Sequence, residues 1–439
     1  MLPRFAIDAL RSGKYVTGLG QRLGKLPKLP VSERPLIWLH CVSVGETEAA
    51  RPLVQALREH FPSYRLAIST TTVTGQQVAQ RIFAADAVTI FYFPIDWAWT
   101  IRRVLGTLQP SAVLIMETEL WPHLLRGCRQ RSIPTALVNG RISPTSLRRY
   151  RKISTFMNRV LNDLTMAMMQ SDQDMSRILE LGMPADRTVR SGNLKFDGAN
   201  VGGSDETTSK LRSRFGLNEK ASIIVAASTH APEEQIVVDA FKLLPQNHNR
   251  KPLRLLIAPR HPERFAEVAE IIRSSGLTWA RRSADPSPAD SNCEVVLLDS
   301  IGELRSVFPV ATIAFIGGSI TPHGGHNVLE PAATGVCVIT GPHTHNFAAI
   351  MDTFLAENAL VQLPEVAGSE APSQLAKTFD ELLQDDSRRQ EIGQRARAVC
   401  ARHRGATERT IQLLDNVLAS PSSANDPLAL PAIHVTAAK

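Results

Sequence analysis

Short apolar segments alternate with amphipathic ones along the first half of the chain. The apolar segment 35–40 is followed by apolar residues at positions 50, 53, 54, 57 and 61, which is the spacing of an amphipathic helix. Further apolar segments of strand length lie at 66–69, 88–91 and 112–116. Strands that alternate with helices predict a parallel sheet covered by helices on both faces.

The same alternation begins again in the second half. Between the halves, residues 201–209 are polar and contain glycine and serine, which predicts a linker. At 439 residues the chain is also long enough for two cores. Beyond the linker, apolar segments of strand length lie at 223–226, 255–257, 295–298, 313–316 and 336–339, and a charged helical stretch runs from about Leu375 to Leu418.

These patterns predict an α/β protein of the GT-B type, in which two doubly wound, Rossmann-like domains face a central cleft. Ligands of such proteins bind beyond the carboxyl ends of the strands. Epimerases and other two-domain α/β proteins share this architecture, so the fold alone names no reaction. The predicted parts are a basic leader at 1–30, an N-terminal domain at 31–200, the linker at 201–209, a C-terminal domain at 210–418 and a disordered tail at 419–439.

Positive charge is concentrated at the start of the chain. The first thirty residues contain six Lys and Arg residues and a single acidic residue, Asp8, with Phe5, Ile7 and Leu10 among them. This pattern fits a short amphipathic helix on a membrane surface, or alternatively a plain solvated leader. The formal net charge of +7 favours acidic partners, but the interleaved basic and aromatic residues of a nucleic-acid binder are missing.

The cysteines and the apolar segments indicate the compartment. The 5 cysteines are scattered without a CxxC pair, which indicates reduced thiols and a cytosolic protein. No stretch approaches the roughly 20 apolar residues that a spanning helix needs. The N-terminus also has no apolar segment of the kind found in secretory signals.

A glycine-rich segment in the second half is the strongest candidate for a ligand site. An apolar strand ends at Ile316 and is followed by four glycines, two histidines and the sequence Asn327-Val328-Leu329-Glu330. Backbone amides at such a loop and helix start can hold a phosphate, and Glu330 has the reach to accept hydrogen bonds from ribose hydroxyls. The alternative is a flexible loop with a surface glutamate. His323 and His326 could be metal ligands, but few partners lie nearby, so hydrogen bonding to a ligand is favoured.

Two further strand ends in the second half carry candidate residues. Pro259 and Arg260 follow one apolar segment, and an arginine there could form bidentate contacts with a phosphate. Ile301, Gly302 and Glu303 follow another strand, where exposed amides could contact a base or ribose. An ordinary helix start explains that spacing equally well.

Acidic and basic residues follow strands in the first half. Glu46 comes directly after the first strand and could deprotonate an attacking hydroxyl, although a carboxylate at a helix start also complements the helix dipole. Glu117 and Glu119 end another strand, and strand alternation predicts that both lie on one face. Lys195 could neutralise a leaving phosphate or bind a sugar carboxylate, or else form a salt bridge to Asp197 or another carboxylate.

A basic cluster surrounds Tyr150 in the first half. It consists of Arg141, Arg148, Arg149, Arg151 and Lys152. A solvated charged face is the usual explanation for such a run. A surface that binds an anionic acceptor is the alternative.

With these residues in view, the chain resembles the 3-deoxy-D-manno-octulosonic acid (Kdo) transferases of glycosyltransferase family 30. The resemblance extends from about Ser12 to Leu418, and several separate motifs in the same order make it specific. The motifs are Ser43-Val44-Gly45-Glu46, Met116-Glu117-Thr118-Glu119-Leu120-Trp121-Pro122, Asn139-Gly140-Arg141-Ile142-Ser143, Gly192-Asn193-Leu194-Lys195-Phe196-Asp197, Ser228-Thr229-His230, Pro259-Arg260-His261-Pro262-Glu263-Arg264 and Gly324-Gly325-His326-Asn327-Val328-Leu329-Glu330.

The resemblance implies a GT-B fold and an inverting transfer of Kdo from CMP-Kdo to lipid IVA, the tetraacylated precursor of lipid A, with no metal and no cofactor besides the donor. It implies that Glu46 is the general base and that Glu117 and Lys195 support the transition state. It assigns acceptor binding to the N-terminal domain and CMP-Kdo binding to the C-terminal domain. The implied CMP-binding residues are Pro259, Arg260, Ile301, Gly302, Glu303, Asn327 and Glu330.

The implied partners are CMP-Kdo, the anionic lipid A precursor and the cytoplasmic face of the inner membrane, and not nucleic acid. The chain departs from the family at its start, where an apolar anchoring helix is usual and only the basic segment is present, so attachment is either peripheral or made by a missing segment. The competing readings are a UDP-sugar enzyme or epimerase of the same fold, or an inactive nucleotide-sugar binder or membrane adaptor. The residues Glu46, Lys195 and Arg260 argue against them.

Overall fold

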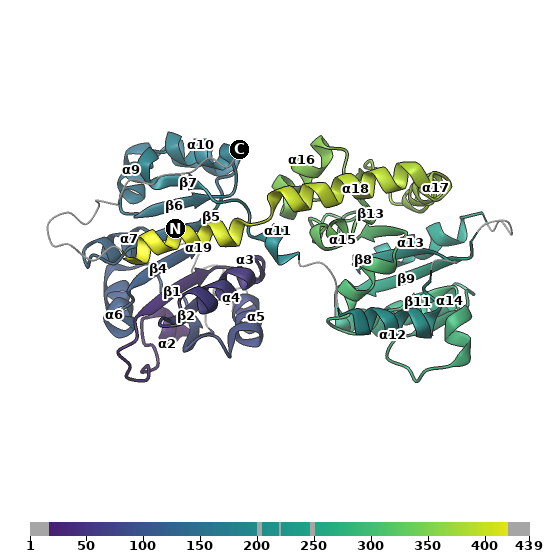
Figure 1. The fold of residues 1–439 in the computed structure, drawn as a ribbon, viewed down its shortest axis with the longest axis horizontal. Coiled ribbons are helices and arrows are strands. Elements are labelled where there is room, and N and C mark those ends of the chain that lie inside the picture. Colours follow the sequence, from purple (N-terminus) through teal and green to yellow (C-terminus); the bar gives the residue numbers. More distant parts are fainter. Residues whose placement is uncertain (1–16, 200–203, 219–220, 246–250, 420–439) are drawn as a thin grey trace. The chain divides into compact units, whose positions relative to one another are not determined.

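The computed structural model describes residues 17–199, 204–218, 221–245 and 251–419 of the chain. Most of the predicted basic leader and nearly all of the predicted tail lie outside these residues, as do residues 201–203 of the predicted linker. The described chain forms two compact units, each built around one parallel sheet (Figure 1). No helix in the described part of the chain has both the length and the apolar character that crossing a bilayer requires.

The first unit contains a seven-stranded parallel sheet in the order β3-β2-β1-β4-β5-β6-β7. Its strands are β1 (Leu36–Cys41), β2 (Arg65–Thr70), β3 (Thr89–Tyr92), β4 (Ala112–Met116), β5 (Thr135–Gly140), β6 (Met166–Met169) and β7 (Thr188–Arg190). Its helices are α2 (Leu19–Arg22), α3 (Val44–Ala49), α4 (Arg51–His60), α5 (Val73–Phe83), α6 (Ala98–Leu108), α7 (Pro122–Arg129), α8 (Pro144–Arg151), α9 (Ser154–Leu161), α10 (Asp172–Glu180), α11 (Lys195–Gly198) and α19 (Ala406–Ala419).

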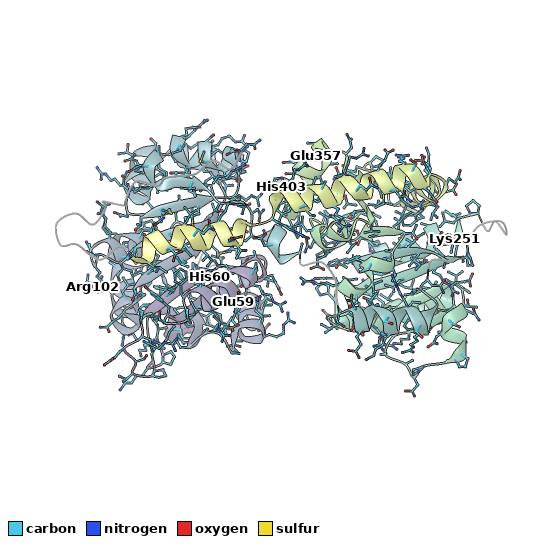
Figure 2. The ribbon with its side chains drawn as sticks, viewed as in Figure 1. Glu59, His60, Arg102, Lys251, Glu357 and His403 are labelled. Carbon is cyan, nitrogen blue, oxygen red and sulfur yellow. The ribbon has the colours of Figure 1, made fainter. Side chains whose placement is uncertain are left out.

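Two apolar cores cover the two faces of this sheet, as alternation along its strands requires. Along β1, Trp38 belongs to the core beneath α6, α7 and α9, while Ile37 and Leu39 belong to the core beneath α4, α5 and α19. All six residues of β1 are buried. Helix α4 ends on the surface at Glu59 and His60 (Figure 2).

The second unit repeats the architecture with a seven-stranded parallel sheet in the order β10-β11-β9-β8-β12-β13-β14. Its strands are β8 (Ser222–Thr229), β9 (Leu253–Pro259), β10 (Trp279–Arg281), β11 (Val295–Leu297), β12 (Ile313–Ile316), β13 (Cys337–Thr340) and β14 (Val361–Gln362). Its helices are α12 (Asp205–Phe215), α13 (Glu233–Lys242), α14 (Phe265–Ser274), α15 (Leu329–Thr334), α16 (Ala348–Ala356), α17 (Ala371–Gln384) and α18 (Asp386–His403). The fold class predicted from the sequence, α/β with two Rossmann-like domains, is confirmed.

The predicted domain boundaries need two corrections. The units divide at Gly198 and again at Arg402, so the first unit also contains the chain from His403 onward. The predicted helical stretch 375–418 is three helices, and its last part, α19, packs Ile411, Leu414 and Val417 into the core of the first unit (Figure 1). The sequence shows that these residues are apolar at helical spacing, but not which core receives them. Helix α12 also begins at Asp205, inside the predicted linker.

Candidate functional site

In each unit, the chain order around the sheet reverses at one pair of neighbouring strands. In the first unit the chain moves from β1 outward to β2 and β3 and returns to β4 on the other side of β1. In the second unit the corresponding pair is β8 and β12. Loops at the carboxyl ends of such a pair diverge and leave room for a ligand. Glu46 and Glu117 follow β1 and β4, and His230 and the glycine-rich segment follow β8 and β12.

Glu46 is a nearly buried carboxyl group at the start of α3, where its side chain is 8% exposed. Its Oε2 accepts a hydrogen bond from the Val42 amide at 2.7 Å, and its Oε1 accepts one from the Ser43 hydroxyl at 3.4 Å. The carboxylate therefore also serves the helix start, as the alternative reading expected. Burial, and then the negative charge of Glu117, raise the pKa of Glu46 to about 8. A carboxyl group with this pKa can exchange a proton with a hydroxyl near neutral pH.

Glu117 and Lys195 form an ion pair beside Glu46. The Lys195 Nζ lies 2.9 Å from Glu117 Oε1, and both side chains are largely buried. Lys195 does not pair with Asp197, whose carboxylate instead accepts hydrogen bonds from the amides of Gly405 and Thr407 at 2.8 and 2.6 Å. Asp197 therefore holds the start of α19.

Strand alternation, the reason given for expecting Glu117 and Glu119 on one face, does not apply, because β4 ends at Met116. Glu117 has a positive φ of 56°, so the backbone leaves the extended conformation there and alternation does not continue. The two carboxyl groups nevertheless interact. Burial, and then the negative charge of Glu117, raise the pKa of Glu119.

A buried network of side-chain amides positions Lys195. The Asn139 Oδ1 accepts from the Leu194 amide at 3.0 Å, and Asn193 Oδ1 accepts from the Lys195 amide at 3.0 Å. Gln170 joins the two, because its Nε2 donates to the Asn139 carbonyl at 2.9 Å and its Oε1 accepts from Asn193 Nδ2 at 3.1 Å. The sequence analysis did not single out Gln170, although a polar residue directly after the short apolar strand β6 was a usable signal.

The basic cluster lies on and around α8. Tyr150 of that helix interacts with Glu119. Burial, and then the negative charge of Glu119, raise the pKa of Tyr150. Arg148, Arg149 and Lys152 are exposed, whereas Arg151 forms an ion pair with Glu180. The cluster therefore adjoins the acidic residues of the first unit, and part of it is a solvated surface.

The His40 side chain and the indole nitrogen of Trp121 are buried polar groups that the sequence analysis did not single out. The Nδ1 of His40 lies 2.9 Å from the Ser69 hydroxyl, and burial lowers the pKa of His40 to about 3. Within the described residues, neither His40 Nε2 nor Trp121 Nε1 has a hydrogen-bond partner. A histidine near the end of an apolar strand was the signal that could have found this pair.

In the second unit, a buried glutamate binds the backbone of the glycine-rich segment. Glu233, which is 0% exposed, accepts from the amides of Gly318, Ser319 and Ile320 at 2.6, 2.9 and 2.8 Å. It also accepts from the His230 amide at 3.1 Å. The amides that directly follow β12 are therefore not free for a phosphate, and only the later part of the loop could supply them. The sequence signal that could have identified Glu233 is its position as an acidic residue in the first turn of a helix that closely follows a strand.

The predicted ribose-binding residues lie together. Glu330 Oε1 accepts from Arg305 Nη2 at 2.9 Å and from Asn327 Nδ2 at 3.2 Å. Asn327 also accepts from the Leu329 amide at 3.0 Å, where α15 begins. Arg305 comes from the segment that contains Ile301, Gly302 and Glu303, so the structure joins two of the predicted motifs.

That segment is shaped as an exposed turn. Ile301 is 73% exposed, and Gly302 has a φ of 92°, which a side chain would strain. Glu303 accepts from Arg282 Nη2 at 2.8 Å. An exposed isoleucine next to ordered ion pairs is available to contact a flat ligand such as a base.

Arg260 follows Pro259, the last residue of β9. Its amide donates to the Thr229 carbonyl at 3.0 Å, which ties the ends of β8 and β9 together. Among the described residues, its exposed guanidinium group has no ion-pair partner. Arg264, four residues later, differs because it is paired with Glu234 at 2.6 Å and Glu267 at 2.8 Å. Arg260 is the cation of this motif that remains available to a ligand.

Comparison with known proteins gives consistent results. The model of a family described as 3-deoxy-D-manno-octulosonic-acid transferase (kdotransferase) matches residues 17–198. The 3-deoxy-D-manno-octulosonic acid transferase of Haemophilus influenzae is 33% identical over 407 residues, which cover 92% of each chain. The transferase of the same name from Bordetella pertussis is 35% identical over 389 residues, which cover 87% of each chain.

The solved structure of UDP-GlcNAc 2-epimerase from Neisseria meningitidis has a similar fold. It is 12% identical, with a TM-score of 0.57, and the match covers 87% of this chain and all of that one. At this identity the likeness concerns the fold alone.

Proposed function

The chain belongs to the Kdo transferase family, and from that premise we propose that it transfers Kdo from CMP-Kdo to lipid IVA with inversion at the anomeric carbon. Membership makes the protein a glycosyltransferase with a role in Kdo transfer during lipopolysaccharide biosynthesis. The donor, the acceptor and the roles of individual residues are the proposal.

One observation carries the catalytic part of the proposal. Glu46 is a carboxyl group of raised pKa, at the strand pair where ligands bind, next to the Glu117–Lys195 ion pair. We assign it the role of general base. The Glu46 carboxylate takes the proton of the acceptor hydroxyl, and the hydroxyl oxygen forms a bond to the anomeric carbon of Kdo. The bond between that carbon and the phosphate oxygen breaks on the opposite face, and its electron pair leaves with CMP.

The donor would be held by the second unit. The free guanidinium of Arg260 is suited to the phosphate, and the joined Asn327 and Glu330 are suited to ribose hydroxyls. The Lys195 ammonium group, held by Glu117, would supply positive charge next to the reacting sugar, so the proposal needs no metal ion. Addition of a chelator should therefore leave the transfer rate unchanged.

A membrane-surface location is part of the proposal. The first unit exposes Trp97 and Trp99 at α6 and Ile153 and Phe156 at α9, the latter beside the basic cluster. Exposed apolar side chains next to cations suit an anionic lipid surface. Flotation of the full chain with anionic but not with neutral vesicles would support this location, and equal recovery with both would contradict it.

Transfer by the purified protein, measured by mass spectrometry with CMP-Kdo and lipid IVA, tests the proposal. We expect Kdo-sized mass increments with wild type. Glu46→Gln should bind CMP normally but transfer nothing above about one part in a thousand, because glutamine cannot accept the proton. Arg260→Ala should instead weaken CMP binding about tenfold or more.

Two outcomes would contradict it. Wild-type turnover by Glu46→Gln would remove the base from the mechanism. Preference for UDP over CMP in the binding measurement would move the protein to another donor class within the same fold.

A further inference from the structure

Four histidine rings gather at the carboxyl ends of three neighbouring strands of the second unit. His230 follows β8, His261 follows β9, and His323 and His326 follow β12. The ring of His230 is stacked on His323 and on His326, with centroids 4.4 and 5.0 Å apart, and meets His261 edge-on at 4.9 Å. Of the four, the sequence analysis considered only His323 and His326, and assigned them no specific partner.

Within this group, His230 and His326 share a hydrogen bond. Their Nε2 atoms are 2.7 Å apart. When both rings are neutral, one ring donates its Nε2–H and the other accepts with an unprotonated Nε2. The two Nε2 atoms then share a single proton. The ring that donates from its Nε2 has a bare Nδ1, so a second proton there would give the pair one positive charge without breaking the hydrogen bond.

The backbone around this pair is built to hold it. A Cβ atom at Gly318 would come within 2.8 Å of the His326 ring, so the absence of a side chain there admits that ring, whereas the His230 ring would be at an ordinary contact distance of 3.4 Å. The Glu233 carboxylate binds the amides of both His230 and Gly318. The two histidines are therefore carried on segments that one buried group ties together.

The charges that face the pair are predominantly positive. From the β9 side come Arg260, Arg264 and His261, and from the β12 side comes His323. Burial first, and then these positive neighbours, lower the pKa of His230 to about 4 and that of His326 to about 3.

The carboxylates of the surrounding elements are already engaged. Glu233 of α13 accepts four backbone amides, and Glu234 and Glu267 bind Arg264. Glu263 lies 3.6 Å from His261 Nδ1. His323 Nδ1 lies 2.7 Å from the Thr321 hydroxyl. The pair is therefore a proton-deficient, partly buried site with positive surroundings, which an anion would complete.

We propose that the His230–His326 pair binds an oxyanion of the nucleotide-sugar donor and takes up one proton as the donor binds. This inference rests on the donor proposed above and adds the residues that recognise its negative charge. An oxyanion placed against the pair offsets the repulsion from Arg260 and the other rings, and so favours the protonated form. The donor offers two such groups, the phosphate and the sugar carboxylate.

The pH dependence follows from the sign of this change. Binding raises the pKa of the pair above that of the free protein, so the extra affinity is fully present at low pH and is lost as the pH rises through the pKa of the occupied site. Between the pKa of the free pair and that of the occupied site, affinity should fall about tenfold for each pH unit, and above the higher pKa it should level.

Isothermal titration of the full chain in buffers of different ionisation enthalpy measures the proton uptake directly. The variants are His326→Gln and His230→Gln, since glutamine keeps a hydrogen-bonding group near the Nε2 position but cannot take a proton. His60→Gln is the matched control, because His60 is exposed on α4 of the other unit (Figure 2). Because every protein meets the same ligand, the titration of the ligand's own phosphate cancels in the difference between wild type and variant.

The ligands separate the two sources of negative charge. We expect wild type, and the His60→Gln control, to take up close to one proton more than His326→Gln and His230→Gln. If the excess appears with CMP and with CMP-Kdo, the phosphate is the anion. If it appears only with CMP-Kdo, the anion is the sugar carboxylate. Cytidine should give no excess.

The failures of this inference and of the proposed donor are distinguishable. Binding of CMP and CMP-Kdo to wild type with no proton uptake beyond that of the variants overturns the role of the histidine pair and leaves the donor in place. Failure of wild type to bind either ligand overturns both. Thermal unfolding of each variant shows whether a loss of affinity arises from a loss of fold instead.

Discussion

Glu46 is largely withheld from water, and among the described residues only the Val42 amide and the Ser43 hydroxyl donate hydrogen bonds to it. Its surroundings therefore disfavour the ionised form that a general base needs, and the Glu117 carboxylate disfavours it further. The result is a base that is strong once it is ionised. The pH at which it ionises becomes an observable property of the enzyme.

We expect kcat/KM for the acceptor to rise about tenfold for each pH unit up to about 8 and then to level, because only the ionised Glu46 can take the proton.

The same raised pKa lowers the stability of the fold at higher pH. The folded state holds this proton more tightly than the unfolded chain does, so stability is lost as the pH rises between about 4.5 and about 8, by about 1.4 kcal/mol per unit. Rate profiles and thermal unfolding across pH measure both effects.

Glu117→Gln tests whether the Glu117 charge contributes to the raised pKa of Glu46. Removing the neighbouring charge should lower the pKa of Glu46 and move the rising limb of the profile to lower pH, by up to about one unit. Glu46→Gln should abolish the limb and become less destabilised at alkaline pH than wild type. A limb at the same pH in Glu117→Gln would show that another group sets it.

At this scale, the sequence predicts residues better than it predicts their partners. Glu46, Glu117 and Lys195 were all identified from positions at strand ends or in the motifs of the family resemblance. That Lys195 would pair with Glu117 was not foreseeable, because Glu117 lies 78 positions away in the chain and follows β4, which β5 and β6 separate from β7 in the sheet. The histidine pair was missed for the same reason, since its members are 96 positions apart.

Among the structural elements, the glycine-rich segment after β12 depends on a residue outside itself. The amides of Gly318, Ser319 and Ile320 in this segment donate to the buried Glu233 carboxylate. The loop is thus ordered by α13, the helix that follows β8.

We expect Glu233→Gln to lower the free energy of unfolding by about 2–5 kcal/mol, because glutamine offers one acceptor oxygen where the carboxylate offers two and turns an N–H group toward backbone donors. Urea unfolding of the full chain measures the change. CMP affinity should fall as well, since the same segment carries His326 and Asn327.

Asp239→Asn is the matched control, because it makes the same chemical change on the outer side of α13, where Asp239 accepts from Gln235 at 2.9 Å. We expect it to cost less than about 0.5 kcal/mol. Equal stability of the two variants would show that the Glu233 contacts contribute nothing to the loop.

Nine of the strands in the described residues match predicted apolar segments, whereas β5, β6, β7, β10 and β14 were not predicted. The segments at 35–40 and 112–116 correspond to β1 and β4, which are buried throughout. In contrast, β7 and β10 have only three residues each, and β5 ends in Asn139 and Gly140. The Asn139 side chain that makes β5 look polar accepts from the Leu194 amide through Oδ1, and the Asn139 carbonyl accepts from Gln170, contacts that a local pattern does not reveal.

The whole molecule consists of one unit that is continuous in sequence and one that is not. The second unit is residues 199–402, whereas the first needs both the chain up to Gly198 and the chain from His403. Just after Arg402, where the chain returns to the first unit, His403 (labelled in Figure 2) stacks on Phe196 with ring centroids 4.8 Å apart. Asp197 holds the start of α19.

We expect Leu414→Ala, a substitution in the core face of α19, to destabilise the first unit by about 2–5 kcal/mol, because Leu414 is completely buried. CMP binding by the second unit should be unchanged. Calorimetry with and without CMP measures both. Gln412→Ala, on the exposed side of the same helix, is the control and should have little effect. A loss of CMP affinity in Leu414→Ala alone would contradict the independence of the units.

The position of α19 also sets an order of events during synthesis. The ribosome releases the second unit in full once Arg402 has emerged, but the first unit lacks its closing helix until the last residues are made. The unit that begins the chain is therefore the last to be finished. Until then the core that α19 completes, which includes Val138, Met166 and Met168, stays unfinished and open to any chaperone that binds incomplete sheets.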